Sequence, residues 1–218
     1  MISVVITNYN GRQYLPDCLS SLALQTYRDF ETIVVDNAST DGSVEFVEGH
    51  YPKVRIVRNR ENLGFAGGTN AGIRAARGEH ILTLNTDAWM ESGCLGHLVK
   101  AMESDDGVGM CATKMVFPNG RIDSAGMCIS RSGAAWGRGM YEQDCGQYDR
   151  LEEVFAPCAG AALYRRALFD EIGLFDEDFF MYVEDVDLAF RGQLAGWRCL
   201  YVPQAKVHHV HGGTAGVG

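Results

Sequence analysis

The sequence predicts an α/β fold in which a mostly parallel central sheet is covered by helices on both faces. Short β-branched runs alternate with amphipathic segments through the first half of the 218-residue chain, which is the pattern of strands joined by helical crossovers. The composition, with 46% hydrophobic and 22% charged residues, is typical of an ordinary soluble protein with a packed core. Because no internal repeat or low-complexity linker divides the chain, we expect a single domain.

Four strands and three helices are expected in the first half. The second helix should begin at Ser39, Thr40 or Asp41, which are all common N-cap residues. The third helix should end at Gly78. The strands are expected over residues 2–7, 30–36, 54–59 and 80–87, and the helices over 14–25, 39–51 and 68–78.

The second half of the chain is less regular. Glycine and polar residues are frequent between residues 108 and 153, which predicts hairpins and mobile loops there. The remaining elements are a helix over 93–104, a strand followed by a helix over 153–173, a helix over 185–194 and a strand over 199–203.

Charge and cysteine content exclude several classes of function. Nineteen Lys and Arg against 28 Asp and Glu give a net charge of −9, which argues against general nucleic-acid binding. Phosphate would then be handled locally, through a divalent cation bound by carboxylates. The seven cysteines include no CxxC pair, and the N-terminus lacks the features of a signal peptide. We therefore expect a cytoplasmic protein with free thiols and no membrane-spanning helix.

Polar residues follow all four strands of the first half. Open parallel sheets bind ligands outside the carboxyl ends of their strands, so we expect these residues to converge. They are Thr7, Asn8 and Tyr9 after the first strand, Asp36 and Asn37 after the second, Asn59 and Asn62 after the third, and Asn85 and Asp87 after the fourth.

Two acids in this set suit a phosphorylated nucleotide. Asp87 lies two positions after Asn85, and such a pair can hold a hard divalent ion whose other ligands are substrate phosphates. An Asx-turn is the alternative. Asp36 can accept a hydrogen bond from a pyrimidine N–H or a ribose hydroxyl, whereas a simple turn before a capped helix would also explain its position.

The segment "NRENLGFAGGTNAGI" is a glycine-rich connection between a strand and a helix. Backbone of this kind can approach a phosphate closely. The segment matches neither a Walker A loop nor GxGxxG, so Gly64, Gly67 and Gly68 are equally explained as the residues of a tight turn.

Acids and histidines in the last forty residues supply candidate catalytic and metal-binding groups. Glu184, Asp185 and Asp187 begin a predicted helix and lie within an apolar run. The helix dipole stabilises acids there, but a carboxylate in an apolar pocket also suits a general base, for which we select Asp185. In "AKVHHVHGG", strand spacing places His209 and His211 on one face. One histidine of this cluster is expected to bind a metal, the alternative being a polar tail.

Together these segments resemble the inverting family 2 nucleotide-sugar glycosyltransferases of GT-A fold, particularly the rhamnosyltransferase-like branch. Six blocks occur in the family's order and cover almost the whole chain. They are "SVVITNYNG" with "LPDCLSSLALQT", "ETIVVDNASTDGS", "NRENLGFAGGTNAGI", "LTLNTDA", "GAALYRRALFDEIGLFDEDFFMYVEDVDLAFRGQLAGW" and "VPQAKVHHVHGG".

The resemblance implies roles for individual residues. Asp185 is similar to the family's catalytic base, Glu184 would bind acceptor and Asp187 would brace the helix. Asp87 resembles the surviving acid of the DxD metal motif, with Asn85 in place of the first acid, and His209 resembles the metal-binding histidine. The implied cofactor is Mg²⁺ or Mn²⁺. The implied nucleotide-sugar site comprises Thr7, Tyr9, Asp36, Asn62, Gly67, Asn85 and Asp87.

The resemblance also implies a reaction and its partners. A sugar would pass with inversion from dTDP-rhamnose or a UDP-sugar to a glycan or lipid-linked glycan acceptor of a surface polysaccharide, with peripheral contact at the inner face of the membrane. A nucleotide-binding half would span about residues 1–90 and an acceptor half about 91–218. Relatives commonly continue beyond the position of "GGTAGVG", so we expect a truncated C-terminus.

Two other functions remain open at this point. One is a catalytically silent nucleotide-sugar-binding module, which would bind nucleotide without forming product. The other is a sugar nucleotidyltransferase, which would carry an N-terminal glycine-rich loop with basic residues. "TNYNGRQY" offers only Arg12 for that purpose.

Overall fold

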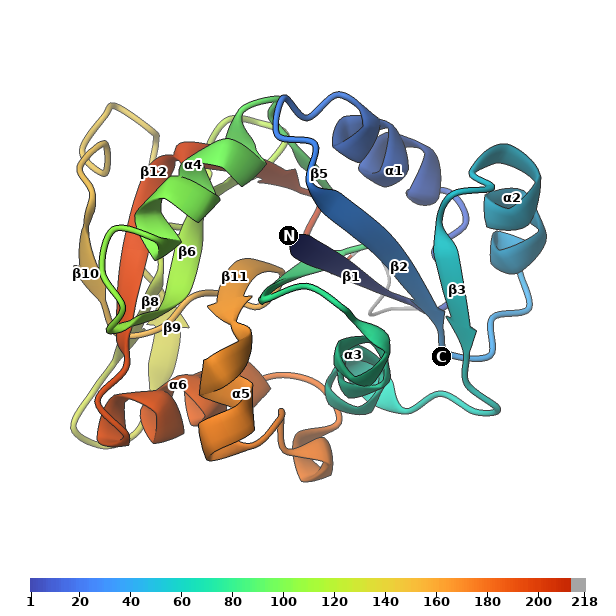
Figure 1. Cartoon of the computed structure of the whole chain (residues 1–218). Helices are drawn as coiled ribbons and strands as arrows, with labels where there is room; N and C mark the ends of the chain where they lie inside the picture. Colours follow the sequence, from blue (N-terminus) through green and yellow to red (C-terminus); the bar gives the residue numbers. More distant parts are fainter. Residues whose placement is uncertain (213–218) are drawn as a thin grey trace.

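A ten-stranded mixed sheet forms the centre of the molecule in the computed structural model, which describes residues 1–212 (Figure 1). The main path across the sheet is β10-β12-β6-β11-β4-β1-β2-β3, with β5 paired to β12 and β7 to β6, while β8 and β9 form a separate pair. The strands are β1 (Ile2–Asn8), β2 (Phe30–Asp36), β3 (Arg55–Arg58), β4 (His80–Asn85), β5 (Ala88–Met90), β6 (Val108–Val116), β7 (Ile122–Ser124), β8 (Met127–Ile129), β9 (Ala135–Gly137), β10 (Glu152–Val154), β11 (Ala161–Arg165) and β12 (Arg198–His209).

The first four strands form a parallel unit, as the sequence predicted. β1 pairs in parallel with β2 on one side and with β4 on the other, so the direction of strand addition reverses at β1. Ligands of open α/β sheets bind at such a reversal. The register places Asn85 beside Thr7 and Asp36 beside Asn8, which brings the polar ends of three neighbouring strands to the same edge.

The prediction of hairpins and loops from residue 108 onward was wrong for β6. This strand lies inside the sheet between β11 and β12, and all nine of its residues are buried. Its glycine and lysine obscured the strand pattern. At Gly109 an added Cβ would lie 2.8 Å from Leu168, so a packed helix requires that glycine. The Lys114 ammonium donates to Asp144 and Asp149 at 2.8 and 2.7 Å, which compensates its burial.

Helices cover both faces of the sheet (Figure 1). Apolar residues of α1, α2 and α4 pack in one core cluster, and those of α3, α5 and α6 pack in another. Among residues 1–212, no helix is long and apolar enough to cross a bilayer. The helices are α1 (Leu15–Ala23), α2 (Ser43–His50), α3 (Gly64–Ala75), α4 (Cys94–Met102), α5 (Arg166–Ile172) and α6 (Glu184–Leu194), with a 3₁₀ turn at η1 (Glu177–Phe179).

The boundaries of α2 and α3 differ most from the sequence prediction. The N-cap of α2 is Gly42, because Asp41 forms a turn in which its carboxylate accepts from the Ser43 N–H at 3.0 Å. Helix α3 begins at Gly64 and ends at Ala75, short of Gly78. The glycine-rich segment is therefore mostly helix and not loop.

Glycines in α3 let that helix approach the sheet closely. A Cβ added at Gly72 would lie 2.3 Å from Val5, and one added at Gly68 would lie 2.6 Å from Thr7 and 2.7 Å from the Asn37 amide. Contacts this short do not occur between real side chains, so both positions require glycine. The close approach carries the N-terminal turn of α3 to the carboxyl edge of β1 and β2.

Candidate active site

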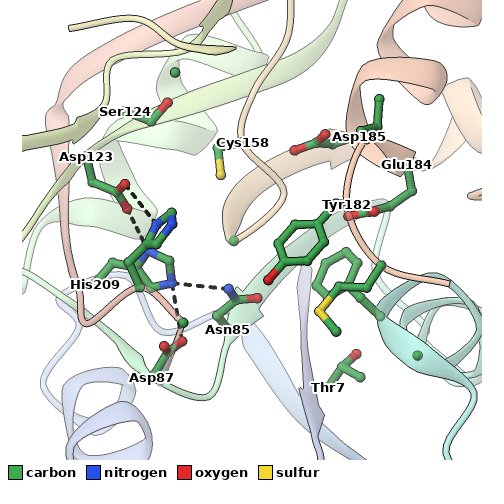
Figure 2. Close-up of a pocket in the computed structure, with 18 of the residues that line it drawn as sticks. Thr7, Asn85, Asp87, Asp123, Ser124, Cys158, Tyr182, Glu184, Asp185 and His209 are labelled. Carbon is green, nitrogen blue, oxygen red and sulfur yellow. Dashed lines mark hydrogen bonds and ion pairs between the residues drawn. The ribbon is translucent and has the colours of Figure 1, made fainter. Parts of the chain in front are cut away.

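A cavity of about 360 Å³ opens at the carboxyl ends of β1 and β4 (Figure 2). Loops and strand ends from both halves of the chain line it. A cluster of imidazole and carboxylate groups lies at one end and a pair of acids at the other, with Asn85 between them (Figure 2). Its polar lining residues include Thr7, Tyr9, Asn37, Asn62, Asn85, Asp87, Asp123, Glu184, Asp185, His209 and His211.

His209 is the centre of the first cluster. It is the last residue of β12, and pairing of that strand with β5 and β6 fixes its position. Its Nε2 lies 3.2 Å from Asp87 Oδ1 and 3.2 Å from the Asn85 amide nitrogen, while its Nδ1 lies 2.6 Å from Asp123 Oδ2. His211 Nδ1 lies 3.1 Å from the other oxygen of Asp123.

The electrostatics of this cluster favour a cation. Burial lowers the pKa of His209, but hydrogen bonds to Asp123 and Asp87 outweigh burial and raise the pKa to about 9. Two nearly inaccessible carboxylates thus surround one imidazole. A positive charge is needed there, and either a proton on His209 or a metal ion can provide it.

The geometry on the Nε2 side of His209 fits a divalent ion. Neighbouring ligands of an octahedral Mg²⁺ lie about 3 Å apart, given ligand distances of about 2.1 Å. Asp87 Oδ1 and His209 Nε2 are 3.2 Å apart, and a half-turn of the Asn85 amide would present its oxygen to the same point. Asp87, His209 and Asn85 can therefore hold Mg²⁺ or Mn²⁺ with little movement.

Glu184 and Asp185 form the acid pair as the first two residues of α6. Asp185 is buried, and its oxygens accept from the backbone N–H groups of Ala159 and Val186 at 3.0 and 2.8 Å. Burial raises its pKa despite these bonds. Burial and the adjacent charge of Asp185 raise the pKa of Glu184 to about 7, and its buried Oε2 has no hydrogen-bond partner among the described residues. Both acids are thus poised to take a proton.

The loop before α6 is strained and carries apolar side chains to the cavity. Phe180, Tyr182 and Val183 have φ of 54°, 74° and 71°, a region that costs such residues of order 1–3 kcal/mol each. The Ala66 N–H donates to the Phe180 carbonyl at 3.2 Å, which ties the loop to α3. Strain maintained in this way is typical of functional sites.

The residues that the sequence predicted to bind the nucleotide fall into two groups, those that line the cavity and those that do not. Thr7, Tyr9 and Asn62 line the cavity together with Asn85 and Asp87. Asp36 and Gly67 are not among the lining residues. The Asp36 carboxylate is buried beneath the carboxyl edge of the sheet, where it accepts from Asn8 Nδ2 at 3.2 Å and Ser39 N at 3.1 Å. Gly67 lies in α3 and packs on Leu63, the N-cap of that helix.

Several lining residues were given no role from the sequence. Asn37 was expected to converge with the other polar strand ends, and it lines the cavity. His211 was considered part of the histidine cluster but was not selected. Asp123 lies on β7, a three-residue strand in the segment expected to be loops, and nothing in its local sequence marks it.

His209 with its two carboxylates and the Glu184–Asp185 pair lie at opposite ends of one cavity, at the reversal point of a sheet that has the GT-A architecture of glycosyltransferases. Solved structures of such enzymes share the architecture. The Pyrobaculum calidifontis mannosyltransferase PcManGT, in complex with GDP-Man and Mn²⁺, gives a TM-score of 0.72 at 22% identity over 96% of this chain. S. aureus TarS 1-349 with UDP gives 0.70 at 21% identity over 95% of this chain.

The chain belongs to glycosyl transferase family 2, whose model matches residues 3–173. A curated relative, the N-acetylglucosaminyl-diphospho-decaprenol L-rhamnosyltransferase of Mycobacterium tuberculosis, is 30% identical over 96% of this chain and 76% of its own length. The chain spans 56% of the PcManGT chain and 59% of the TarS chain.

Proposed function

We propose that this glycosyltransferase is metal-dependent and moves a sugar with inversion from a nucleoside-diphosphate sugar to a glycan acceptor. The observation that carries this proposal is the position of Glu184 and Asp185 across one cavity from Asp87 and His209 (Figure 2). One side suits the diphosphate of a donor, and the other suits the hydroxyl of an acceptor. The nucleotide-binding half is then about residues 1–90 and the acceptor half the remainder.

The donor nucleotide would lie along the carboxyl edge of the parallel strands. Thr7, Tyr9, Asn37 and Asn62 supply hydrogen-bonding groups there. In this arrangement Asn37 would contact the base or the ribose. Asp36 would stabilise the position of Asn37 indirectly, because its carboxylate accepts from Asn8 and from the backbone of the turn at Ser39. Asn59 holds the Asn37 side-chain oxygen at 2.7 Å, which fixes the orientation of its amide.

Asp87, His209 and Asn85 would hold Mg²⁺ or Mn²⁺. When bound, the ion neutralises charge on the departing diphosphate. An acidic protein with a net charge of −9 has particular need of such a cation to accept a diphosphate. The Mn²⁺ in the PcManGT complex supports this choice.

Asp185 would act as general base. Its carboxylate, with a raised pKa, takes the proton from the acceptor hydroxyl as that oxygen attacks the anomeric carbon opposite the leaving diphosphate. One displacement inverts the anomeric centre, and no covalent sugar–enzyme intermediate forms. Glu184, beside Asp185 in the lining of the cavity, would bind the acceptor. Asp187, ion-paired with Arg191 at 2.7 Å, braces the helix.

The name of the mycobacterial relative suggests the substrates. Its name describes transfer of L-rhamnose to N-acetylglucosaminyl-diphospho-decaprenol, so we propose dTDP-rhamnose, or else a UDP-sugar, as donor and a lipid-linked glycan as acceptor. Phe180, Met181 and Tyr182 at the cavity mouth are exposed beside Glu184. They supply an apolar surface for such an acceptor at the membrane face.

Calorimetric titration with UDP and dTDP, each with and without Mn²⁺, tests the donor site. Binding of one nucleotide that strengthens with Mn²⁺ supports the proposal and selects the donors for transfer assays. Binding without any product for every donor tried would favour a silent binding module. If neither nucleotide binds, the proposed donor site is wrong.

The general base is tested with two acids of one helix. Asp185→Asn should retain donor affinity and lose transfer by about 10²–10⁴-fold, the usual contribution of a general base. Asp187→Asn is the matched control and should keep transfer near the wild-type rate. Near-normal turnover by Asp185→Asn would exclude the assigned role.

A further inference from the structure

Asp123 contacts two imidazoles, one with each of its carboxylate oxygens. Its carboxylate is 3% exposed, with His209 Nδ1 at 2.6 Å from Oδ2 and His211 Nδ1 at 3.1 Å from Oδ1. Figure 2 shows it on the far side of the His209 ring from Asp87. Asp123, His209 and His211 could themselves hold a metal ion, since their ligand atoms lie within 4.8 Å of one another.

The local structure directs this side chain into the cluster. On β6, Met115 pairs with Ser124 of β7 and the next residue, Val116, pairs with Ile122. Asp123 is thus one extra residue on β7, which is the definition of a β-bulge. Bulges re-aim side chains and occur often beside active sites.

The two nitrogens of the His209 ring lie at different distances from the carboxylates that face them, and this difference indicates the role of each nitrogen. Two ligands of one octahedral ion lie about 3 Å apart. The separation of 3.2 Å between Nε2 and Asp87 fits that value, whereas the 2.6 Å between Nδ1 and Asp123 is a short hydrogen bond. Nδ1 therefore carries a hydrogen toward Asp123, and Nε2 is left to face Asp87.

We propose that Asp123 is a positioning residue that fixes the ring orientation and tautomer of His209, so that Nε2 is presented to the divalent cation. A carboxylate that accepts from the distal N–H of a metal-bound histidine also raises the basicity of that ligand. His211 holds the second oxygen of Asp123 and does not bind the ion. This inference rests on the proposed metal dependence.

Manganese affinity tests the proposal without any measurement of sugar transfer. Titration of the purified protein with Mn²⁺, with UDP or dTDP present, should give a Kd that rises about 10–100-fold in Asp123→Ala. Asp123→Asn should lose less, because its amide oxygen can still accept from Nδ1–H. His208→Gln, at a position of β12 where the ring stacks on Trp89 and does not line the cavity, is the matched control and should bind Mn²⁺ like the wild type, while Asp87→Ala should lose most of the affinity.

Pulsed EPR of the bound Mn²⁺ provides an independent readout, because it counts coordinated imidazole nitrogens. One nitrogen is expected in the wild type, and two would show that His211 is a ligand and overturn the proposal. If Asp123→Ala fails to fold, a Kd of Asp123→Asn equal to that of the wild type overturns the positioning role. Unchanged affinity in folded Asp123→Ala overturns the positioning role alone, whereas absence of Mn²⁺ binding by the wild type overturns the metal dependence as well.

Discussion

Glu184 should make the folded protein less stable as the pH rises. The residue is 6% exposed, and the pKa of its carboxyl group rises from 4.5 to about 7 because of burial and the charge of Asp185. The unfolded chain therefore loses this proton at lower pH than the folded protein does. Between those two pKa values the folded state binds more protons, so its stability falls with increasing pH and levels off above about pH 7.

The magnitude follows from the size of the pKa change. Each pKa unit corresponds to about 1.4 kcal/mol, so an ionised Glu184 destabilises the fold by about 3 kcal/mol at pH 8. Most of this destabilisation develops between pH 5 and pH 8, because the pKa of the folded state lies between those values. Glu184→Gln cannot ionise and should lack this component, and its melting temperature relative to wild type should rise by roughly 5–10 °C over that range.

Thermal and urea unfolding of wild type and Glu184→Gln at several pH values measures this difference. Any change in packing caused by the amide is independent of pH, so it cancels when the two ends of the range are compared. Glu79→Gln, at an exposed glutamate before β4, is the matched control and should follow the wild-type curve. If the stability of wild type and Glu184→Gln changes with pH in the same way, the raised pKa of Glu184 is refuted. The interpretation of Glu184 as a functional acid would then lose this support.

Three further predictions concern other parts of the site. Asp87→Ala should abolish the effect of Mn²⁺ on nucleotide binding while the circular dichroism spectrum is unchanged; unfolding would instead show a structural role. Gly68→Ala should lower the free energy of unfolding, measured with urea, by about 1–3 kcal/mol, because the new Cβ would lie 2.6 Å from Thr7. Gly96→Ala on α4 is the control, and it should be neutral or stabilising because the space around Gly96 is open. Burial raises the pKa of the Cys158 thiol, so iodoacetamide should modify exposed Cys145 before the half-buried Cys158, as mass spectrometry would detect; equal rates would contradict the raised pKa.

The sequence could predict those parts of the fold in which local pattern and tertiary position agree. The strands from Ile2 to Asn85 are apolar runs that end in polar residues, and the rule for parallel sheets places their ends together. β6 was missed because Gly109 and Lys114 disrupt its pattern for reasons that lie elsewhere in the chain, namely a packed helix and two distant acids. Asp123 was missed for a similar reason, since a bulge against β6 gives it its position.

The two ends of the cavity have opposite electrostatic requirements, and this opposition explains why the site joins distant segments. At one end, Asp87 and Asp123 surround His209 and need a positive charge. At the other, Glu184 and Asp185 must be able to accept a proton, so their surroundings disfavour negative charge. One short segment cannot provide both environments. The fold separates them by placing one beside the end of β12 and the other at the start of α6, with the parallel strands between them. Under the proposed function, a donor sugar bound between the two ends would have its leaving diphosphate beside His209, and the attacking hydroxyl of the acceptor would lie beside Asp185.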